Sequence, residues 1–381
     1  MVLQDFKIIF DNPQASFFIG ETVTGRLVVQ LNQPKYMRSI LVKFRGEANC
    51  AWSESRTVRN NGEEETHVTQ YKDHDLYFEN HVTLFGGTGN TEVLPPGSHF
   101  YQFSLPLPNH LPSSFEGKYG HIRYSVKGII DRPWKFNHEV MANFTVLSKV
   151  DLNLDPVYRA PVQLEKSKYF CCCCCKSGPM NFIFHIPSKG YVPGQYIPVT
   201  VDIENGSNVK VLYVTCELLK TVTYFCASPR STKQECTEIA HLVFDDPVPA
   251  NDSKTFTGQM RIPPVPPSML KACSIIDLDY RLIVKAVPKG MHGSLEHCVT
   301  VVIGTVPLWQ SSCPQQPTAA PSAPPVELRV APAPPTAYTD MPLPTYEECM
   351  QEPGMPMTGA MGYSPRYPTY KLPGGPSTAG N

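Results

Sequence analysis

The sequence predicts an all-β protein with two tandem β-sandwich domains and a Pro-rich C-terminal tail. Apolar residues recur mainly at every second position, in short runs separated by Gly, Pro and Asn, which is the period of half-buried strands. No run of ten or more residues carries a convincing apolar stripe at the spacing of a helix. A motif order that occurs twice and a change of composition after residue 306 divide the chain into its parts.

Three runs in the first half show the strand pattern. Their alternate apolar residues are Leu27, Val29 and Leu31; Ile40, Val42 and Phe44; and Ile122, Tyr124 and Val126. Polar residues mostly fill the positions between them, so each strand is expected to turn one face toward a core and the other toward solvent.

The internal repeat predicts two related domains. "FFIGETVTGRLVVQL" is echoed by "GYVPGQYIPVTVDIE", with Gly20 matching Gly194. In each half a Pro-rich approach then leads into an alternating strand, which carries Tyr124 in the first half and Tyr280 in the second. Pro cannot donate to a sheet ladder, so these approaches are expected at an edge or a crossover. The unit is too long for a solenoid repeat, and we expect one domain at 1–148 and the other at 180–306.

Two segments fall outside these domains. Residues 149–179 are expected to be a linker with a cysteine cluster. Residues 307–381 hold 17 of the 39 prolines and have few charges and few large apolar residues. Such a segment cannot recover its ordering entropy by burial, so the tail is expected to be disordered and rich in polyproline II conformers.

The charge balance and the cysteines limit the class of protein. With 33 basic and 34 acidic residues the net charge is −1, which lacks the basic footprint of a nucleic-acid binder. The sequence shows no apolar run long enough to span a membrane and no secretory signal at its start, so we expect a cytoplasmic location. The 13 cysteines are odd in number and include five in a row, and they are expected to be reduced thiols.

Four stretches together resemble one known family. "GETVTGRLVVQL", "FEGKYGHIRYSVKGIIDRPWKFNHE", "KGYVPGQ" and "IPPVPPSMLKACSIIDLDYRLIVKAVPK" are similar to the arrestin-domain-containing proteins, or α-arrestins, in the order of that family. The resemblance covers both predicted domains, about residues 5–306, and the tail that follows. It implies an N-terminal and a C-terminal arrestin domain with immunoglobulin-like sandwiches, followed by a tail that recruits ubiquitin ligases to membrane cargo.

The same resemblance points to WW-domain ligands in the tail. The family motif is Pro-Pro-x-Tyr, and this chain has a Leu-Pro-x-Tyr variant followed by a second Pro-x-Tyr that lacks the first Pro or Leu. The candidate WW-binding residues are Leu343, Pro344, Tyr346, Pro368 and Tyr370. A WW groove would receive the Pro on an aromatic face and the Tyr ring in its own pocket. A tyrosine with no partner in a low-complexity segment is the alternative.

A second short motif matches the tetrapeptide by which tails recruit the UEV domain of the ESCRT machinery. It consists of Pro321, Ser322, Ala323 and Pro324. A chance match in a Pro/Ala-rich stretch is the alternative for this motif.

The cysteine run is a candidate site of S-acylation. It consists of Cys171, Cys172, Cys173, Cys174 and Cys175. Five adjacent thiols cannot converge on a tetrahedral metal ion, so no metal is expected. Neighbouring lysines in a flexible linker favour reversible acylation, as clustered cysteines do in the family, and an unmodified run is the alternative.

No signature of catalysis is found in the sequence. It lacks a nucleophile elbow, a zinc-protease helix motif and a phosphate loop, so we expect neither an enzyme nor a cofactor. Lys127, Arg132 and Lys135 could meet acidic or phosphorylated cargo, but a solvated strand face also accounts for them. Trp134 is expected to be a packing anchor.

These inferences together predict an adaptor. The sandwiches would select a membrane receptor or transporter, and the tail would bring a WW-domain HECT-type ubiquitin ligase, promoting ubiquitination, endocytosis and sorting at the plasma membrane and endosomes. The alternative is a trafficking scaffold of the retromer-associated kind, which acts without a ligase. The Pro-x-Tyr motif distinguishes the two, because such a scaffold has no use for it.

Overall fold

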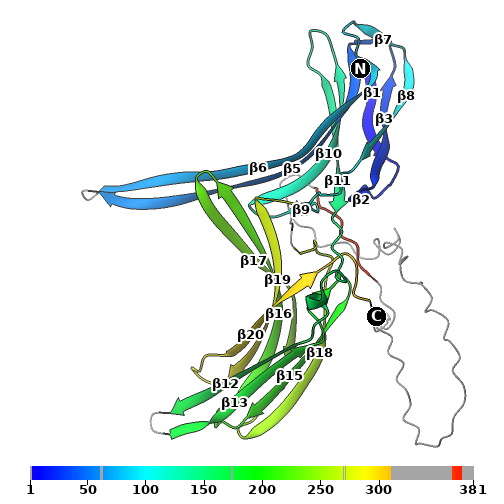
Figure 1. Ribbon diagram of the computed structural model, residues 1–381. Coiled ribbons are helices and arrows are strands. Elements are labelled where there is room, and N and C mark those ends of the chain that lie inside the picture. The colour runs from blue at the N-terminus through cyan, green and yellow to red at the C-terminus, as the bar shows by residue number, and fades with distance from the viewer. Residues whose placement is uncertain are drawn as a thin grey trace, which may run out of the picture.

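The computed structural model describes residues 2–60, 63–172, 175–268, 270, 272–309 and 363–370. These residues form two β-sandwiches, drawn one above the other in Figure 1. The helical element within the described ranges is a single 3-10 turn, η1, at Pro156–Tyr158. The predicted all-β fold with two sandwich domains is confirmed.

The N-terminal domain packs a small sheet against a larger one. The small sheet has the order β1 (Leu3–Phe10), β3 (Thr22–Leu31), β8 (Gly97–Pro106). The larger sheet has the order β2 (Ser16–Phe18), β11 (His138–Leu147), β10 (Gly120–Asp131), β5 (Ser39–Asn60), β6 (Glu63–Gly86), with β9 (Phe115–Glu116) beside β10. A short ribbon pairs β4 (Lys35–Met37) with β7 (Glu92–Leu94). Strand β2 joins β11 in parallel, whereas the other pairs in this domain are antiparallel.

The C-terminal domain repeats this arrangement. One sheet has the order β12 (Val162–Cys172), β13 (Cys175–Ile186), β15 (Tyr196–Asn205), β18 (Asp252–Arg261). The other has the order β14 (Gly190–Tyr191), β20 (Leu295–Ile303), β19 (Ile276–Pro288), β16 (Val211–Ala227), β17 (Arg230–Phe244). The parallel pair of β14 and β20 corresponds to that of β2 and β11.

The predicted core strands are confirmed by burial. Every second residue of β10, including Ile122, Tyr124 and Val126, is fully buried, and β19 shows the same pattern around Tyr280. The alternation arises because successive side chains of a strand point to opposite faces. Apolar residues at every second position therefore fill the space between the two sheets of each domain.

The predicted internal repeat is also confirmed at the level of hydrogen bonds. The Tyr124 hydroxyl donates to the carbonyl of Pro112 at 2.7 Å, and the Tyr280 hydroxyl donates to that of Pro266 at 2.6 Å. In both domains the Pro-rich approach crosses from one sheet to the other, as expected. The buried tyrosine satisfies a loop carbonyl that lacks a ladder partner, and so fixes the approach against the central strand.

The linker is shorter than expected. Residues 162–172 form β12, an edge strand of the C-terminal domain, and Cys175–Ile186 form its hairpin partner β13. Val162 and Phe170 are buried, but Glu165, Lys166 and Lys168 lie between them and hide the strand pattern in the sequence. The segment between the domains is therefore 148–161, which we call the crossover.

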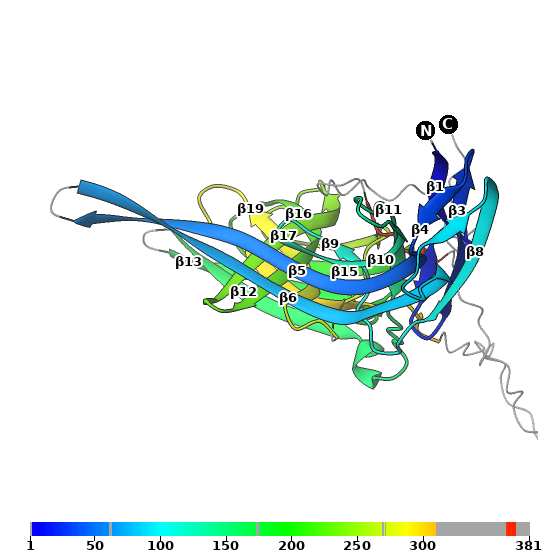
Figure 2. The same cartoon turned by 90° about the horizontal axis from the view of Figure 1, so that it is seen from above.

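A long hairpin ties the two domains together. Strands β5 and β6 continue well past the N-terminal sandwich, as Figure 2 shows from above. On their way Asp73 accepts a hydrogen bond from the amide of Ala227 at 2.8 Å, and Asp75 accepts one from the amide of Ser274 at 2.8 Å. These bonds anchor the loops at the end of β16 and before β19 on the N-terminal domain.

Candidate functional site: the seam between the two sandwiches

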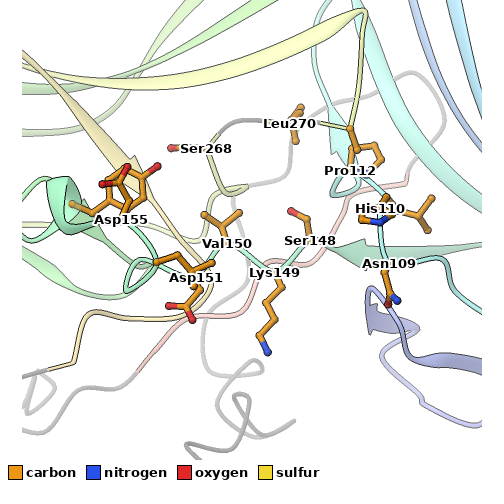
Figure 3. A pocket seen from close by; sticks show the side chains of 14 residues that line it. Asn109, His110, Pro112, Ser148, Lys149, Val150, Asp151, Asp155, Ser268 and Leu270 are labelled. Atoms are coloured by element: carbon orange, nitrogen blue, oxygen red, sulfur yellow. The ribbon is translucent and has the colours of Figure 1, made fainter. Parts of the chain in front are cut away.

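The two domains meet the crossover at a surface that we call the seam. It is formed by the crossover itself, by the Pro-rich loops 107–114 and 262–268, and by the backbone around residues 144–145, 192–194 and 302–305. Figure 3 shows a cavity in it, of about 490 Å³, with Asn109 to Pro112 on one side and Ser148 to Asp151 of the crossover on the other.

The crossover is held by hydrogen bonds to both domains. The amide of Ser148 donates to Ser113 Oγ of the N-terminal domain at 2.9 Å. The amide of Val150 donates to Thr305 Oγ1 of the C-terminal domain at 2.7 Å, and the amide of Thr305 donates back to the Val150 carbonyl at 2.9 Å. The crossover is therefore a structural part of the seam.

A segment of the C-terminal tail, residues 363–370 with the sequence "YSPRYPTY", lies across the seam and is drawn in red in Figure 1. On the N-terminal domain, the Tyr363 hydroxyl donates to the Phe144 carbonyl and the Tyr367 hydroxyl to the Ser114 carbonyl, each at 3.0 Å. The amide of Arg366 donates to Thr145 Oγ1 at 3.3 Å. The first half of the segment thus binds strand β11 and the adjacent Pro-rich loop.

The end of the segment binds the C-terminal domain. The amide of Tyr370 donates to the Pro193 carbonyl at 2.9 Å, and the Tyr370 hydroxyl donates to the Thr305 carbonyl. The Tyr370 side chain also packs against a small cluster of the buried residues Leu152, Val192 and Val302. One eight-residue segment therefore touches both sandwiches and the crossover.

Burial along the segment follows its contacts. Pro365 and Pro368 are buried, whereas Ser364 and Arg366 are exposed. Burial also raises the pKa of the Tyr363 hydroxyl and raises that of the Tyr367 hydroxyl well above its ordinary value. These tyrosines consequently stay protonated, as hydrogen-bond donors to carbonyls must be.

Comparison with protein families covers both sandwiches. Residues 6–153 match the N-terminal domain of arrestin (or S-antigen), and residues 176–308 match its C-terminal domain. Arrestin domain-containing protein 4 of Mus musculus is 30% identical over 308 residues, which are 78% of this chain and 70% of that protein.

This chain belongs to the arrestin-domain-containing family. Arrestin domain-containing protein 17 of Caenorhabditis elegans is 28% identical over 315 residues, 80% of this chain and 71% of that protein. The human thioredoxin-interacting protein is 26% identical over 286 residues, 74% of this chain and 70% of that protein. The predicted resemblance is therefore confirmed, and membership of this family supports a general role as a trafficking adaptor or scaffold.

One of the two predicted WW ligands of this arrestin-domain-containing protein lies within the described residues. Pro368 is buried and Tyr370 is engaged by the seam, so the expectation of an open, disordered tail is wrong for 363–370. The reason is local: three tyrosines and two prolines supply rings that the average composition of the tail conceals. The other candidate WW residues, Leu343, Pro344 and Tyr346, lie outside the described residues, as does the UEV motif 321–324.

Three residues of the cysteine run lie at the ends of the paired strands β12 and β13. Cys171 and Cys172 end β12, and Cys175 begins β13 and pairs with Cys172. Cys173 and Cys174 lie outside the described residues. The described cysteines therefore belong to paired strands of the C-terminal domain, and S-acylation of the run stays a prediction.

The three basic residues predicted as a possible cargo site lie on β10 and in the turn after it, and none of them lines the cavity of the seam. Lys127 pairs with Glu139 at 2.7 Å, and the Arg132 side chain donates from Nε to the Phe136 carbonyl at 2.8 Å. Lys135 is exposed in the same turn between β10 and β11. Trp134, expected to be a packing anchor, is fully exposed there at a φ of +58°. That expectation is wrong, because the residue lies in a turn and its neighbours were mistaken for strand.

Sequence reasoning missed the seam itself. Its polar residues include Ser113, Ser114 and Thr305, which bind through single hydroxyl or carbonyl groups. Such groups belong to no recognisable sequence motif. Within the described ranges, no helix is long and apolar enough to cross a bilayer.

Proposed function

We propose that this protein is an adaptor that links membrane-protein cargo to a WW-domain HECT-type ubiquitin ligase. The observation that carries the proposal is the Leu343-Pro344-x-Tyr346 motif in a Pro-rich tail that follows two arrestin domains. The domains would select a receptor or transporter at the plasma membrane or endosomes, and ubiquitination would then direct its endocytosis and sorting.

The chemistry of the motif explains how it would bind. A WW groove accepts the ring of Pro344 between aromatic side chains and the ring of Tyr346 in an adjacent pocket. So small a surface gives weak binding, on the order of micromolar to tens of micromolar for one site. A ligase with several WW domains would gain affinity by engaging a second site on the same tail.

Two further sites would support the same role. The UEV motif of residues 321–324 would connect ubiquitinated cargo to the ESCRT machinery. Acyl chains on the cysteine run would hold the far end of the C-terminal domain at a membrane, since such chains add affinity with each buried methylene group. Together they would place the adaptor peripherally at the membranes that carry its cargo.

A direct titration tests the proposal. Purified full chain is titrated with a tandem-WW fragment of a HECT ligase, and Tyr346→Ala should weaken binding at least tenfold because the Tyr pocket is left empty. Tyr338→Ala is the matched control: it removes a tyrosine of the same tail that has Thr336, not Pro, two residues before it. Equal binding by the wild type and the Tyr346→Ala variant would favour the ligase-free scaffold instead.

A further inference from the structure

We propose that the seam is a built peptide-binding site for Pro- and Tyr-containing segments, that its occupant is residues 363–370 of the same chain, and that this occupancy withholds the second Pro-x-Tyr motif from WW domains. The contacts of residues 363–370 with the two domains are the evidence for the binding site. Only the competition with WW domains rests on the proposed function.

The contacts have the form of sequence-selective recognition. Three tyrosine hydroxyls, those of Tyr363, Tyr367 and Tyr370, each donate to a backbone carbonyl of the folded domains. Carbonyl groups accept a phenol but would repel a phosphate, so the site selects unmodified tyrosine. The exposed Ser364 and Arg366 alternate with these anchors and add no buried surface of their own.

The internal repeat shows how the end of the segment fits against the C-terminal domain. The two Pro-rich loops begin alike, with the amide of Leu107 donating to the Glu21 carbonyl at 2.8 Å and that of Ile262 donating to the Gln195 carbonyl at 2.9 Å. They also end alike, with Ser114 and Ser268 bonded to β11 and β20. Between these anchors the N-terminal loop, 107–114, has one residue more than the C-terminal loop, 262–268.

The difference in loop length changes which atoms lie against Gly20 and Gly194, the two glycines that match in the repeat. A Cβ on Gly20 would lie 2.5 Å from Oδ1 of Asn109, which belongs to the longer loop. A Cβ on Gly194 would lie 2.6 Å from the carbonyl oxygen of Tyr370 and 3.0 Å from its amide nitrogen. The tail therefore occupies, on the C-terminal domain, the place that the domain's own loop fills on the N-terminal one.

Docking in the seam and binding to a WW domain exclude each other at this motif. A WW groove must cover the rings of both Pro368 and Tyr370. In the seam Pro368 is buried, and the Tyr370 ring packs on the Leu152 cluster. The WW affinity of this motif should therefore be reduced by the fraction of chains in which the segment is released.

Hydrogen exchange of the full chain tests the site without any ligase. The amides of Arg366 and Tyr370 should be protected, since they donate to Thr145 and Pro193. The double variant Tyr363→Ala, Pro365→Ala should lose this protection, because it removes the hydrogen-bonded Tyr363 ring and the buried Pro365 ring, both outside the Pro-x-Tyr motif. The control Ser364→Ala, Arg366→Ala removes the two exposed side chains between them and should keep it. Exchange at the unprotected rate in the wild type, or protection unchanged in the anchor variant, would overturn the site.

WW titration in a Tyr346→Ala background tests the competition. A synthetic peptide of residues 359–376 should bind a WW domain at least tenfold more tightly than the full chain does. The anchor variant of the full chain should approach the affinity of the peptide, and the control variant should not. Peptides carrying the same substitutions show whether the variants alter WW binding directly.

The outcomes of the two experiments are separable. A full chain that binds as tightly as the peptide, or a peptide that binds no WW domain, would overturn the competition. Neither result would affect the hydrogen-exchange measurement. That measurement tests only whether residues 363–370 bind the seam. Loss of WW binding on Tyr346→Ala, measured separately, decides the proposed ligase role.

Discussion

Two buried tyrosines occupy equivalent positions in the two domains. The hydroxyls of Tyr124 and Tyr280, both fully buried, hold two Pro-rich loops at equivalent positions. The sequence repeat predicted that these two tyrosines match and that each lies in an alternating strand. It could not predict the acceptors, Pro112 and Pro266, because a carbonyl is the same in every residue and its availability depends on the course of the loop.

Removing either hydroxyl should destabilise its domain. Tyr124→Phe and Tyr280→Phe each leave a buried carbonyl without a donor, which costs about 1–2 kcal/mol in the free energy of unfolding. Chemical denaturation of the two variants measures the loss. Tyr36→Phe, at an exposed position, is the control and should be neutral. A neutral Tyr124→Phe variant would show that the loop finds another donor.

His121 should make the N-terminal domain sensitive to mild acid. Burial, and then the positive charge of Arg123, lower the pKa of the His121 imidazole below its ordinary value near 6.5. The folded state therefore favours neutral histidine, and below about pH 6.5 the unfolded chain takes up a proton that the folded chain refuses. Stability from this residue is complete above pH 6.5 and declines as the pH falls toward the folded pKa.

Thermal unfolding between pH 7.5 and 5.5 checks this sign. The Tm of the wild type should fall over this range by more than the Tm of His121→Gln, because glutamine does not titrate. Comparing the two slopes removes the contribution of groups that both proteins share. Parallel slopes would mean that His121 is protonated as readily in the folded state as in the unfolded chain.

Among the elements, the strands with clean alternation were predicted and the strands with charged inner or edge positions were not. Strands β3, β10 and β19 follow directly from their apolar pattern. Strand β12 was mistaken for linker because an edge strand exposes more of its side chains, and lysines and a glutamate suit such an edge. The length of the β5 and β6 hairpin also escaped prediction, since its middle part makes contacts with the other domain.

The turn of the β12 and β13 hairpin should be the acylated part of the protein. Hydroxylamine-sensitive labelling of the protein from cells should disappear when Cys171 to Cys175 are all replaced by Ser. The matched control is Cys236→Ser, Cys298→Ser, which removes two exposed thiols on strands β17 and β20 and should leave the label unchanged. Label that persists in the fivefold variant would contradict the acylation of this hairpin.

At the scale of the whole molecule, the structure joins two domains and a piece of the tail into one assembly. Family and domain order could be predicted because they rest on long motifs. The contact of 363–370 with the seam could not be predicted, because it depends on the shape that two domains create together. Within the described residues the tail is thus part of the fold at one motif, and the motif around Tyr346 remains the primary candidate for ligase recruitment.

Phosphorylation of Tyr346 should act like its removal. A phosphate carries up to two negative charges, which a pocket shaped for a phenol cannot bury cheaply. A tail peptide of residues 338–352 with phosphotyrosine at 346 should bind a WW domain at least tenfold more weakly than the unmodified peptide. Equal affinities by fluorescence polarisation would contradict the buried-tyrosine mode of binding.

The most direct test of the adaptor account is affinity capture from cell membranes, comparing the wild type with the double variant Tyr346→Ala, Tyr370→Ala. The account predicts that the variant retains its membrane-protein cargo, because the sandwiches are unchanged, but loses the HECT-type ligase and the ubiquitin on that cargo. Ligase capture that is undiminished in the double variant would contradict the account.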